Sequence, residues 1–254
     1  MKPIQIYKPS NLQTIVFGVS FLLIILVTVL LSYVTFSSNS RIDDNGKTLT
    51  AKAFLILIAL MISCAFILFR HINKPKFSLF EDGIKINNGD IISFETITDV
   101  YLFLSGKNIG NNYNNLAFKT YENESWNIIS ADYSGNINIF LDLYCTTKVL
   151  FLENELENKK SINFHYIPKN KTNAFAIGAN SFVKNLKTET IVVSDKHIII
   201  KDKAYEYQSL KPLYLNNNKF EIKTLNEQIL LSFTYLNMMS FDVFRKIYNQ
   251  RTTK

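Results

Sequence analysis

IVFGVSFLLIILVTVLLSYVTF (Ile15–Phe36) and AFLILIALMISCAFILF (Ala53–Phe69) are two apolar stretches that contain no charged residue. As α-helices rising about 1.5 Å per residue they would measure roughly 33 and 26 Å, against about 30 Å for the hydrocarbon core of a bilayer. The first stretch also exceeds the roughly 7–15 apolar residues of a cleaved signal peptide. We therefore predict a transmembrane hairpin over residues 1–76, with spans at about 15–36 and 53–69.

Basic residues indicate the limits of the second span and the orientation of the hairpin. Lys52 and Arg70 bracket that span and are expected at the membrane boundary, where long basic side chains reach the headgroups. Five basic residues flank the hairpin outside the connecting loop and three lie within the loop: Lys2, Lys8, Arg70, Lys74 and Lys76 against Arg41, Lys47 and Lys52. Because Lys and Arg favour the cytoplasmic side, both termini are predicted in the cytoplasm. The two cysteines, Cys64 and Cys145, are consistent with a cytoplasmic polar domain, because they cannot form a disulfide framework within it, as an oxidising compartment would favour.

The hairpin itself is predicted to be an anchor. Neither apolar stretch contains Asp, Glu, Lys, Arg or His, which transporters and proton relays usually place at membrane depth. Ala59 and Ser63 form a small-xxx-small pair that would let another helix approach closely, although the same pattern also arises by chance. We predict a helix-helix packing face there and leave homo-oligomerisation open.

From Phe77 onward, short runs of Ile, Val, Phe and Tyr alternate with turns containing Asn, Asp or Gly, as in antiparallel strands. The predicted strands are Phe77–Phe80, Ile84–Ile86, Ile91–Phe94, Val100–Leu104, Leu116–Thr120, Trp126–Ser130, Ile137–Leu143, Val149–Leu152 and Ser161–Tyr166. Apolar residues recur at helical spacing in Ala174–Leu186 and Ser240–Tyr248. The sequence therefore predicts an α+β membrane protein, in which a transmembrane hairpin precedes a mainly antiparallel β domain with capping helices.

The strand pattern recurs 113 residues later in the chain. Seven positions correspond without a gap: Phe80, Asp82, Ile86, Phe94, Ile97, Tyr101 and Leu102 match Val193, Asp195, Ile199, Tyr207, Leu210, Tyr214 and Leu215. Two duplicated β modules, at 77–187 and a shorter 188–254, would explain the match. The alternative is that two unrelated β meanders share ordinary alternation, and both interpretations stay open.

LFEDGI (Leu79–Ile84) and IISFETITDV (Ile91–Val100), after a membrane hairpin, resemble bacterial pleckstrin-homology-like (bPH) domains. Members of that family often open with one or two spans, followed by a strand, an Asp-Gly turn, a strand and an aromatic-x-x-Ile element. Phe94 stands at the aromatic position, and Tyr207-Gln208-Ser209-Leu210 would be a degraded second instance. The resemblance implies a strongly bent β-sandwich or partial barrel capped by a helix, in a multi-pass protein of the bacterial inner membrane. The fold by itself does not imply phosphoinositide binding.

Charge and motifs argue against nucleic-acid binding and catalysis. The formal charge is +7, but residues 71–254 hold 22 Lys and Arg against 19 Asp and Glu, a net charge of +3 with the signs interspersed. The chain has no His-Glu-x-x-His, Cys-x-x-Cys, Gly-x-Ser-x-Gly or Walker motif. Cys145 acting as a nucleophile with His165 is a weaker alternative to a cysteine in the core. We predict no nucleic-acid partner, no enzymatic activity, no catalytic residue, no cofactor and no metal site.

These observations predict a non-enzymatic, membrane-anchored interaction protein that presents its cytoplasmic β domain to a protein partner, for example as an immunity protein against a bacterial toxin. The predicted partner contacts are Trp126, Lys107, Tyr113 and Tyr121. The alternative is an antiphage membrane effector, whose β domain senses a nucleotide signal and whose hairpins oligomerise to disrupt the membrane. A pocket lined by Lys and Tyr would favour the effector, whereas a filled core would favour the interaction protein. A third alternative is a subunit that is stable only within a larger membrane complex.

Overall fold

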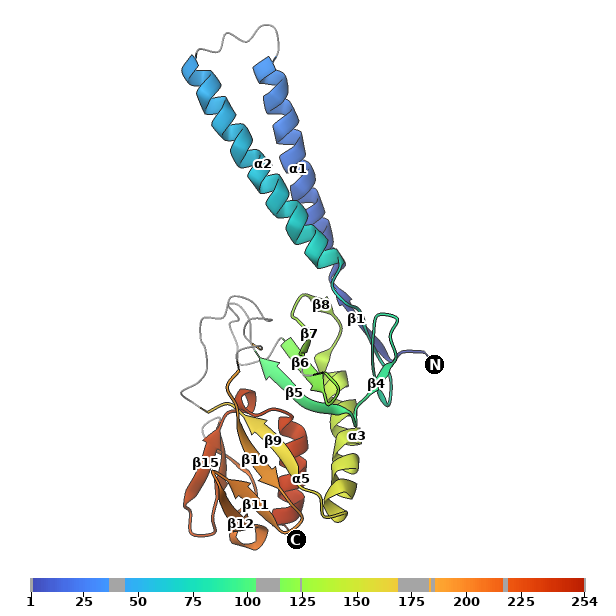
Figure 1. The fold of residues 1–254 in the computed structure, drawn as a ribbon, viewed down its shortest axis with the longest axis vertical. Helices are drawn as coiled ribbons and strands as arrows, with labels where there is room; N and C mark the ends of the chain where they lie inside the picture. Colours follow the sequence, from blue (N-terminus) through green and yellow to red (C-terminus); the bar gives the residue numbers. More distant parts are fainter. Residues whose placement is uncertain are drawn as a thin grey trace. The chain divides into compact units, whose positions relative to one another are not determined.

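The computed structural model describes residues 2–36, 44–103, 115–123, 125–168, 183, 186–216 and 219–253. The chain forms two compact units. The hairpin unit comprises Tyr7–Lys76 and Asp132–Ser134, and the β unit comprises Met1–Ile6, Phe77–Ala131 and Gly135–Lys254. Two long apolar helices and mainly antiparallel sheets confirm the α+β prediction at this level (Figure 1).

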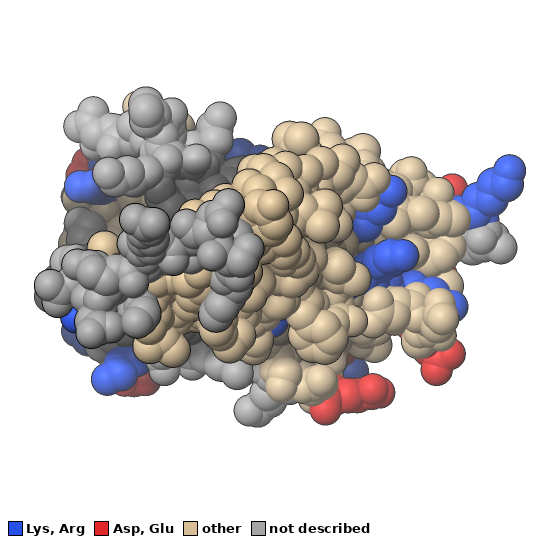
Figure 2. Space-filling model, turned by 90° about the horizontal axis from the view of Figure 1, so that it is seen from above, with Lys and Arg blue, Asp and Glu red and all other residues tan. Residues whose placement is uncertain are grey.

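In the hairpin unit, α1 (Asn11–Phe36) packs against α2 (Asp44–Ile72). Both helices are long and apolar enough to cross a membrane, and none of the residues in their most apolar windows is buried. In the view of Figure 2, uncharged side chains make up most of the described surface. The helices contain the predicted spans 15–36 and 53–69 and extend beyond them, mainly at their amino ends.

Half-buried residues mark the face on which each helix meets the other. On α2 they recur every three or four residues: Phe54, Leu57, Met61, Cys64 and Leu68. The matching side of α1 carries hydroxyl groups, and Thr28, Ser32 and Thr35 each donate to the backbone oxygen four residues earlier at 2.7–2.8 Å. These bonds satisfy the polar groups within the helix itself, which suits an apolar surrounding.

The first half of the β unit contains two small sheets and a helix. Strands β2 (Phe77–Leu79), β3 (Gly83–Ile86) and β4 (Ile91–Ser93) form antiparallel hairpins, and the start of β1 (Gln5–Pro9) lies next to β2. A second sheet contains β5 (Ile97–Phe103), β6 (Asn115–Thr120) and β7 (Asn127–Ile129) in that order. Helix α3 (Ile137–Glu157) follows. The last residues of β1 pair with β8 (Tyr133–Ser134) within the hairpin unit.

The second half repeats this order of elements. The first sheet has the order β12-β11-β10-β9 and the second β13-β14-β15. Their bounds are β9 Ile162–Tyr166, β10 Glu189–Val193, β11 His197–Ile200, β12 Lys203–Glu206, β13 Tyr214–Asn216, β14 Lys219–Lys223 and β15 Ile229–Phe233. Short 3-10 helices, η2 (Tyr207–Ser209) and η3 (Tyr235–Asn237), precede β13 and α5 (Phe241–Thr252). Helices α3 and α5 pack against each other (Figure 1).

Two predicted strands are wrong, because Ile137–Leu143 and Val149–Leu152 both belong to helix α3. The buried side chains of α3 include a stripe with a spacing of four: Phe140, Tyr144, Lys148, Leu152 and Leu156. A charged residue inside this stripe and a high content of Ile, Val and Phe concealed the helical period. Asn136 caps the helix, since its side chain accepts a hydrogen bond from the backbone nitrogen of Asn138 at 3.0 Å.

The other predicted strands are present, with ends shifted by up to three residues. The predicted helix Ser240–Tyr248 is confirmed as α5, which continues to Thr252. The predicted helix Ala174–Leu186 lies outside the described residues apart from Val183 and Leu186.

The gapless offset of 113 residues is wrong in the first hairpin. There the turn closed by Phe80 N and Gly83 O corresponds to the one closed by Ser194 N and His197 O, 114 residues later. From β4 onward the offset is 113, because the β11–β12 turn is one residue shorter than the β3–β4 turn. The equivalent strand pairs show the shortening: Lys85 pairs with Ile91 across the first turn, whereas Ile199 pairs with Ala204 across the second.

Aromatic packing in the two halves is also alike. In the first half Phe94, in the turn before β5, meets Phe140 and Tyr144 of α3 edge-to-face at 5.6 and 6.1 Å between ring centroids. In the second half Tyr207 meets Tyr248 of α5 in the same way at 6.5 Å. Each helix also stacks two rings four residues apart: Phe140 on Tyr144 at 5.9 Å and Phe244 on Tyr248 at 5.7 Å. Side chains therefore fill the core of each half.

Candidate functional site

A cavity of about 320 Å³ lies in the β unit where α3 and β9 come together. Residues of β5, of α3, and of the turn and strand that follow α3 line it, and Tyr144 of the first aromatic core forms part of its wall. We call it the α3–β9 cavity. Its polar lining consists of Thr98, Tyr121, Tyr144, Lys148, Glu155, Lys160, Ser161, Asn163, His165 and Ser240.

Lys148 is the feature that distinguishes this cavity. Its side chain is only 3% exposed, and Nζ donates a hydrogen bond of 2.5 Å to the backbone oxygen of Glu95. The rings of Tyr121 and Phe151 lie 5.8 and 5.0 Å from Nζ, within the range of cation–π contacts. Among the described residues, no carboxylate lies within 4 Å of Nζ. A buried ammonium group beside a cavity therefore has no ion-pair partner there.

The electrostatic consequence is a shifted pKa. Burial lowers the pKa of Lys148 from 10.5 to about 8, although the more distant carboxylates of Glu95, Asp99 and Glu155 oppose the shift. Desolvation disfavours the charged form because the ammonium group loses water that protein groups do not fully replace.

The other charged side chains around the cavity are paired. Lys160 Nζ lies 2.7 Å from a carboxylate oxygen of Glu155. Behind the wall, the buried carboxylate of Asp99 lies 3.0 Å from His165 Nδ1 and 3.1 Å from Lys119 Nζ. The carboxylates of Glu155 and Asp99 are therefore already paired with other side chains, and the positive charge of Lys148 has no paired counter-charge at the cavity.

A second depression, in the other half of the β unit, offers less. It is more open, and its lining includes Asp195, His197, Glu206 and Arg251. Its guanidinium group is already engaged, because Arg251 Nη1 lies 2.6 Å from Asp195 Oδ1. We therefore regard the α3–β9 cavity as the candidate binding site.

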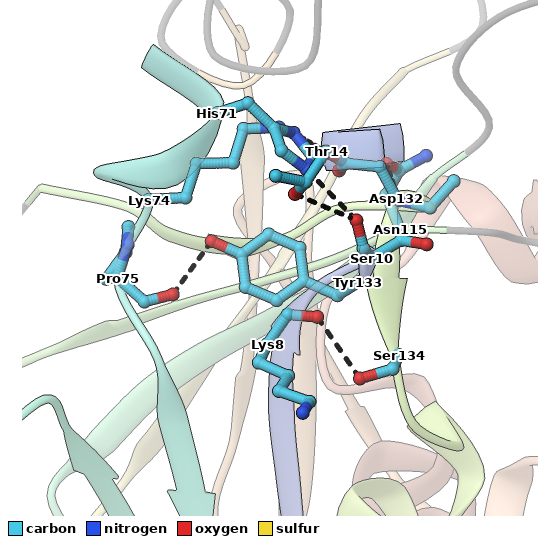
Figure 3. A network of polar contacts seen from close by, with 11 residues as sticks. Lys8, Ser10, Thr14, His71, Lys74, Pro75, Asn115, Asp132, Tyr133 and Ser134 are labelled. Atoms are coloured by element: carbon cyan, nitrogen blue, oxygen red, sulfur yellow. Dashed lines mark hydrogen bonds and ion pairs between the residues drawn. The ribbon is translucent and has the colours of Figure 1, made fainter. Parts of the chain in front are cut away.

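The base of the hairpin unit holds a separate polar network (Figure 3). His71, at the carboxyl end of α2, is 3% exposed and places Nε2 3.3 Å from the backbone oxygen of Ser10 and Nδ1 3.4 Å from Asp132. Lys74 also pairs with Asp132. The Tyr133 hydroxyl donates to the backbone oxygen of Pro75 at 3.0 Å. These contacts tie together the two ends of the hairpin and β8.

Two of the predicted partner contacts can be placed. Tyr121 is 69% exposed and borders the α3–β9 cavity. Trp126 is half-buried: it packs against an apolar cluster that includes Tyr101, and Lys119 Nζ lies 5.3 Å from its ring. Lys107 and Tyr113 lie outside the described residues.

The residues predicted for the membrane part are all at the surface of the hairpin. Ala59 and Ser63 are exposed on a side of α2 other than its contact face with α1, and Ser63 Oγ donates to the backbone oxygen of Ala59 at 2.8 Å. Lys52 and Arg70 are exposed, and the Arg70 guanidinium group lies 5.7 Å from the Phe66 ring.

Lys148 and Asp99 were not predicted as site residues from the sequence, and His165 was predicted only as a possible partner of Cys145. The signal for Lys148 was present, because it is the charged member of an otherwise apolar stripe that repeats every fourth residue. That signal is visible only when 137–157 is recognised as a helix. Asp99 and His165 lie 66 residues apart in sequence, and no local pattern connects them.

Other chemistry has little support in the described part of the chain. Burial raises the pKa of the Cys145 thiol, which disfavours the reactive thiolate. No group of three or more His, Cys, Asp or Glu among the described residues could hold a metal ion. No protein-family model matches the chain, and neither a curated protein nor a solved structure shows a significant match to it.

Proposed function

We propose that this protein is a non-enzymatic binding protein of the bacterial inner membrane. Its hairpin crosses the bilayer twice, both termini are cytoplasmic, and the β unit binds a partner at the membrane surface. An immunity protein against a toxin would be one such protein. Anchoring raises the effective concentration of the β unit for partners that reach the same surface.

The observation that carries the proposal is the apolar surface of the hairpin. Helix α1 from Ile15 onward and helix α2 between Ala53 and Phe69 bear large apolar side chains, and most of these are exposed, for example Leu22, Val34, Leu55 and Ile62. Contiguous apolar surfaces of this size are normally covered. Lipid would cover both helices at once and leave the charged ends in water.

The order of elements in the β unit supports a pair of bPH-like modules. Each half has hairpin strands, a buried aromatic residue in a turn or short 3-10 helix, a three-stranded sheet and a helix. Phe94 with Ile97, and Tyr207 with Leu210, are buried at the positions of the aromatic-x-x-Ile element. We propose a duplicated module on this basis.

The test is membrane insertion of the full chain. Cells expressing the protein with a fluorescent reporter after Lys254 should retain it in membranes after alkaline carbonate extraction, with the reporter protected from added protease outside the cell. The matched control is a Leu23→Arg, Ile62→Arg double variant, because a charge at the centre of a span costs about 2.5–3.5 kcal/mol on insertion. Release of the unmodified protein by carbonate, or an external carboxyl terminus, would refute the proposal.

The signal-sensing effector is the second candidate, and the α3–β9 cavity favours it because Lys148, Lys160, Tyr121 and Tyr144 line that cavity. The filled aromatic cores favour the interaction protein. Growth and dye uptake of expressing cells separate the two, since a triggered effector permeabilises its host membrane and an anchor leaves the membrane intact.

A further inference from the structure

We propose that the α3–β9 cavity binds a small, singly charged organic anion with a flat unsaturated part, whose anionic group pairs with Lys148. This inference rests on the proposed binding function of the β unit and names a ligand class for it. It does not depend on the orientation of the hairpin.

Charge is the first argument. A buried ammonium group is unfavourable unless it is paired, and Lys148 has a backbone oxygen and two rings but no carboxylate within 4 Å among the described residues. An anionic group in the cavity would supply the missing counter-charge. Because Glu155 and Lys160 neutralise each other at 2.7 Å, the cavity favours one negative charge rather than two.

Size and shape are the second argument. A volume of about 320 Å³ lies at the lower end of the roughly 300–1,000 Å³ range of small-molecule sites. A lone chloride or phosphate ion would leave much of this space to water. The exposed ring of Tyr121, together with Phe151, offers a surface on which an unsaturated group can stack.

Hydrogen-bonding groups from several elements also line the cavity. Thr98 comes from β5, Ser161 and Asn163 from the segment after α3, and Lys148 from α3 itself. Groups from separate elements converge on one cavity, which is typical of a site that orients a ligand. The site also depends on the packing of both halves of the β unit.

The experiment uses the full chain in detergent and two anions, 4-hydroxybenzoate and cyclic AMP, with their neutral counterparts 4-hydroxybenzamide and adenosine. Isothermal titration calorimetry and ligand-observed NMR, at ligand concentrations up to about 10 mM, should detect binding of at least one of the two anions. The neutral counterpart of that anion should bind more weakly or not at all. Lys148→Met should lower the affinity for that anion at least tenfold, and Glu155→Gln should raise it several-fold. Lys196→Met, the same change as Lys148→Met at an exposed turn outside this cavity, should leave the affinity unchanged.

Proton uptake provides an independent readout. When an anion binds near pH 8.5 and pairs with Lys148, the Lys148 amine should take up a proton from the buffer. This uptake is measured as a binding heat that varies with the ionisation enthalpy of the buffer. The proposal is overturned if neither anion binds, or if Lys148→Met binds as well as the original chain. Because the assay is in detergent, these outcomes are independent of a failure of membrane insertion.

Discussion

Lys148 illustrates how a single buried charged residue can lower the stability of a fold. An ammonium group buried without an ion pair lowers the free energy of unfolding, and the lowered pKa of about 8 expresses that penalty. A neutral side chain of similar length would fill the same space without this desolvation penalty. Residues that weaken the fold in this way are characteristic of functional sites.

Replacing Lys148 should therefore stabilise the protein at neutral pH. Lys148→Met removes a charge whose pKa shift corresponds to about 3 kcal/mol, and it loses a hydrogen bond worth about 1 kcal/mol, so a net gain of roughly 1–3 kcal/mol is expected at pH 7. The folded-state pKa lies below 10.5, so the unfolded chain binds the proton more tightly.

The advantage of the variant should shrink between pH 8 and pH 10.5, because in that range the original protein gains stability as the pH rises. Denaturant unfolding of both proteins at pH 7 and pH 10 measures the difference. A variant that is less stable at pH 7 would contradict this account of Lys148.

At the level of secondary structure, the choice between a strand period and a helical period in α3 determines which of its side chains are buried. As a strand, 149–152 would place Leu150 and Leu152 on the same face. As a helix, α3 buries Leu152 to 5% exposure and leaves Leu150 65% exposed. The helix also covers the first aromatic core and provides one wall of the cavity.

The same substitution at these two positions should therefore have unequal effects. Leu152→Ala should lower the free energy of unfolding by about 2–5 kcal/mol, because it removes buried methyl groups and leaves a void. Leu150→Ala should change it by less than about 0.5 kcal/mol, as is usual at exposed sites. Denaturant titrations of the two variants measure the contrast, and equal losses would argue for the strand.

At the scale of the molecule, the segment before α5 joins the two halves of the β unit. Ser240, in a left-handed conformation with φ 48°, donates from its backbone nitrogen to Val100 O at 2.7 Å. Its Oγ accepts from Val100 N at 3.1 Å and lies 2.8 Å from the Tyr144 hydroxyl. One serine thus connects β5, α3 and α5, and the adjoining Met239 N donates to His165 O at 2.9 Å.

A double-mutant cycle tests this junction. Ser240→Gly keeps the left-handed backbone accessible but removes Oγ, and should destabilise the protein by about 1–3 kcal/mol. Tyr144→Phe should cost about 1–2 kcal/mol by removing the hydroxyl from the same buried contact. Since both changes remove the same hydrogen bond between Ser240 Oγ and the Tyr144 hydroxyl, the double variant should lose at least 0.5 kcal/mol less than the sum of the single variants. Additive losses would show that the two groups act independently.

The sequence alone determined the two apolar helices, most of the strands and the terminal helix, because each depends on a local period of apolar residues. It also located the recurring strand pattern to within one residue, since a shortened turn leaves the flanking strands in place. That 137–157 forms one helix depends on tertiary contacts, because its buried stripe includes Lys148, whose ammonium group is accommodated by the backbone oxygen of Glu95 and two rings. The α3–β9 cavity likewise arises from residues far apart in sequence, such as Thr98, Lys148 and His165, and packing alone determines which of them meet.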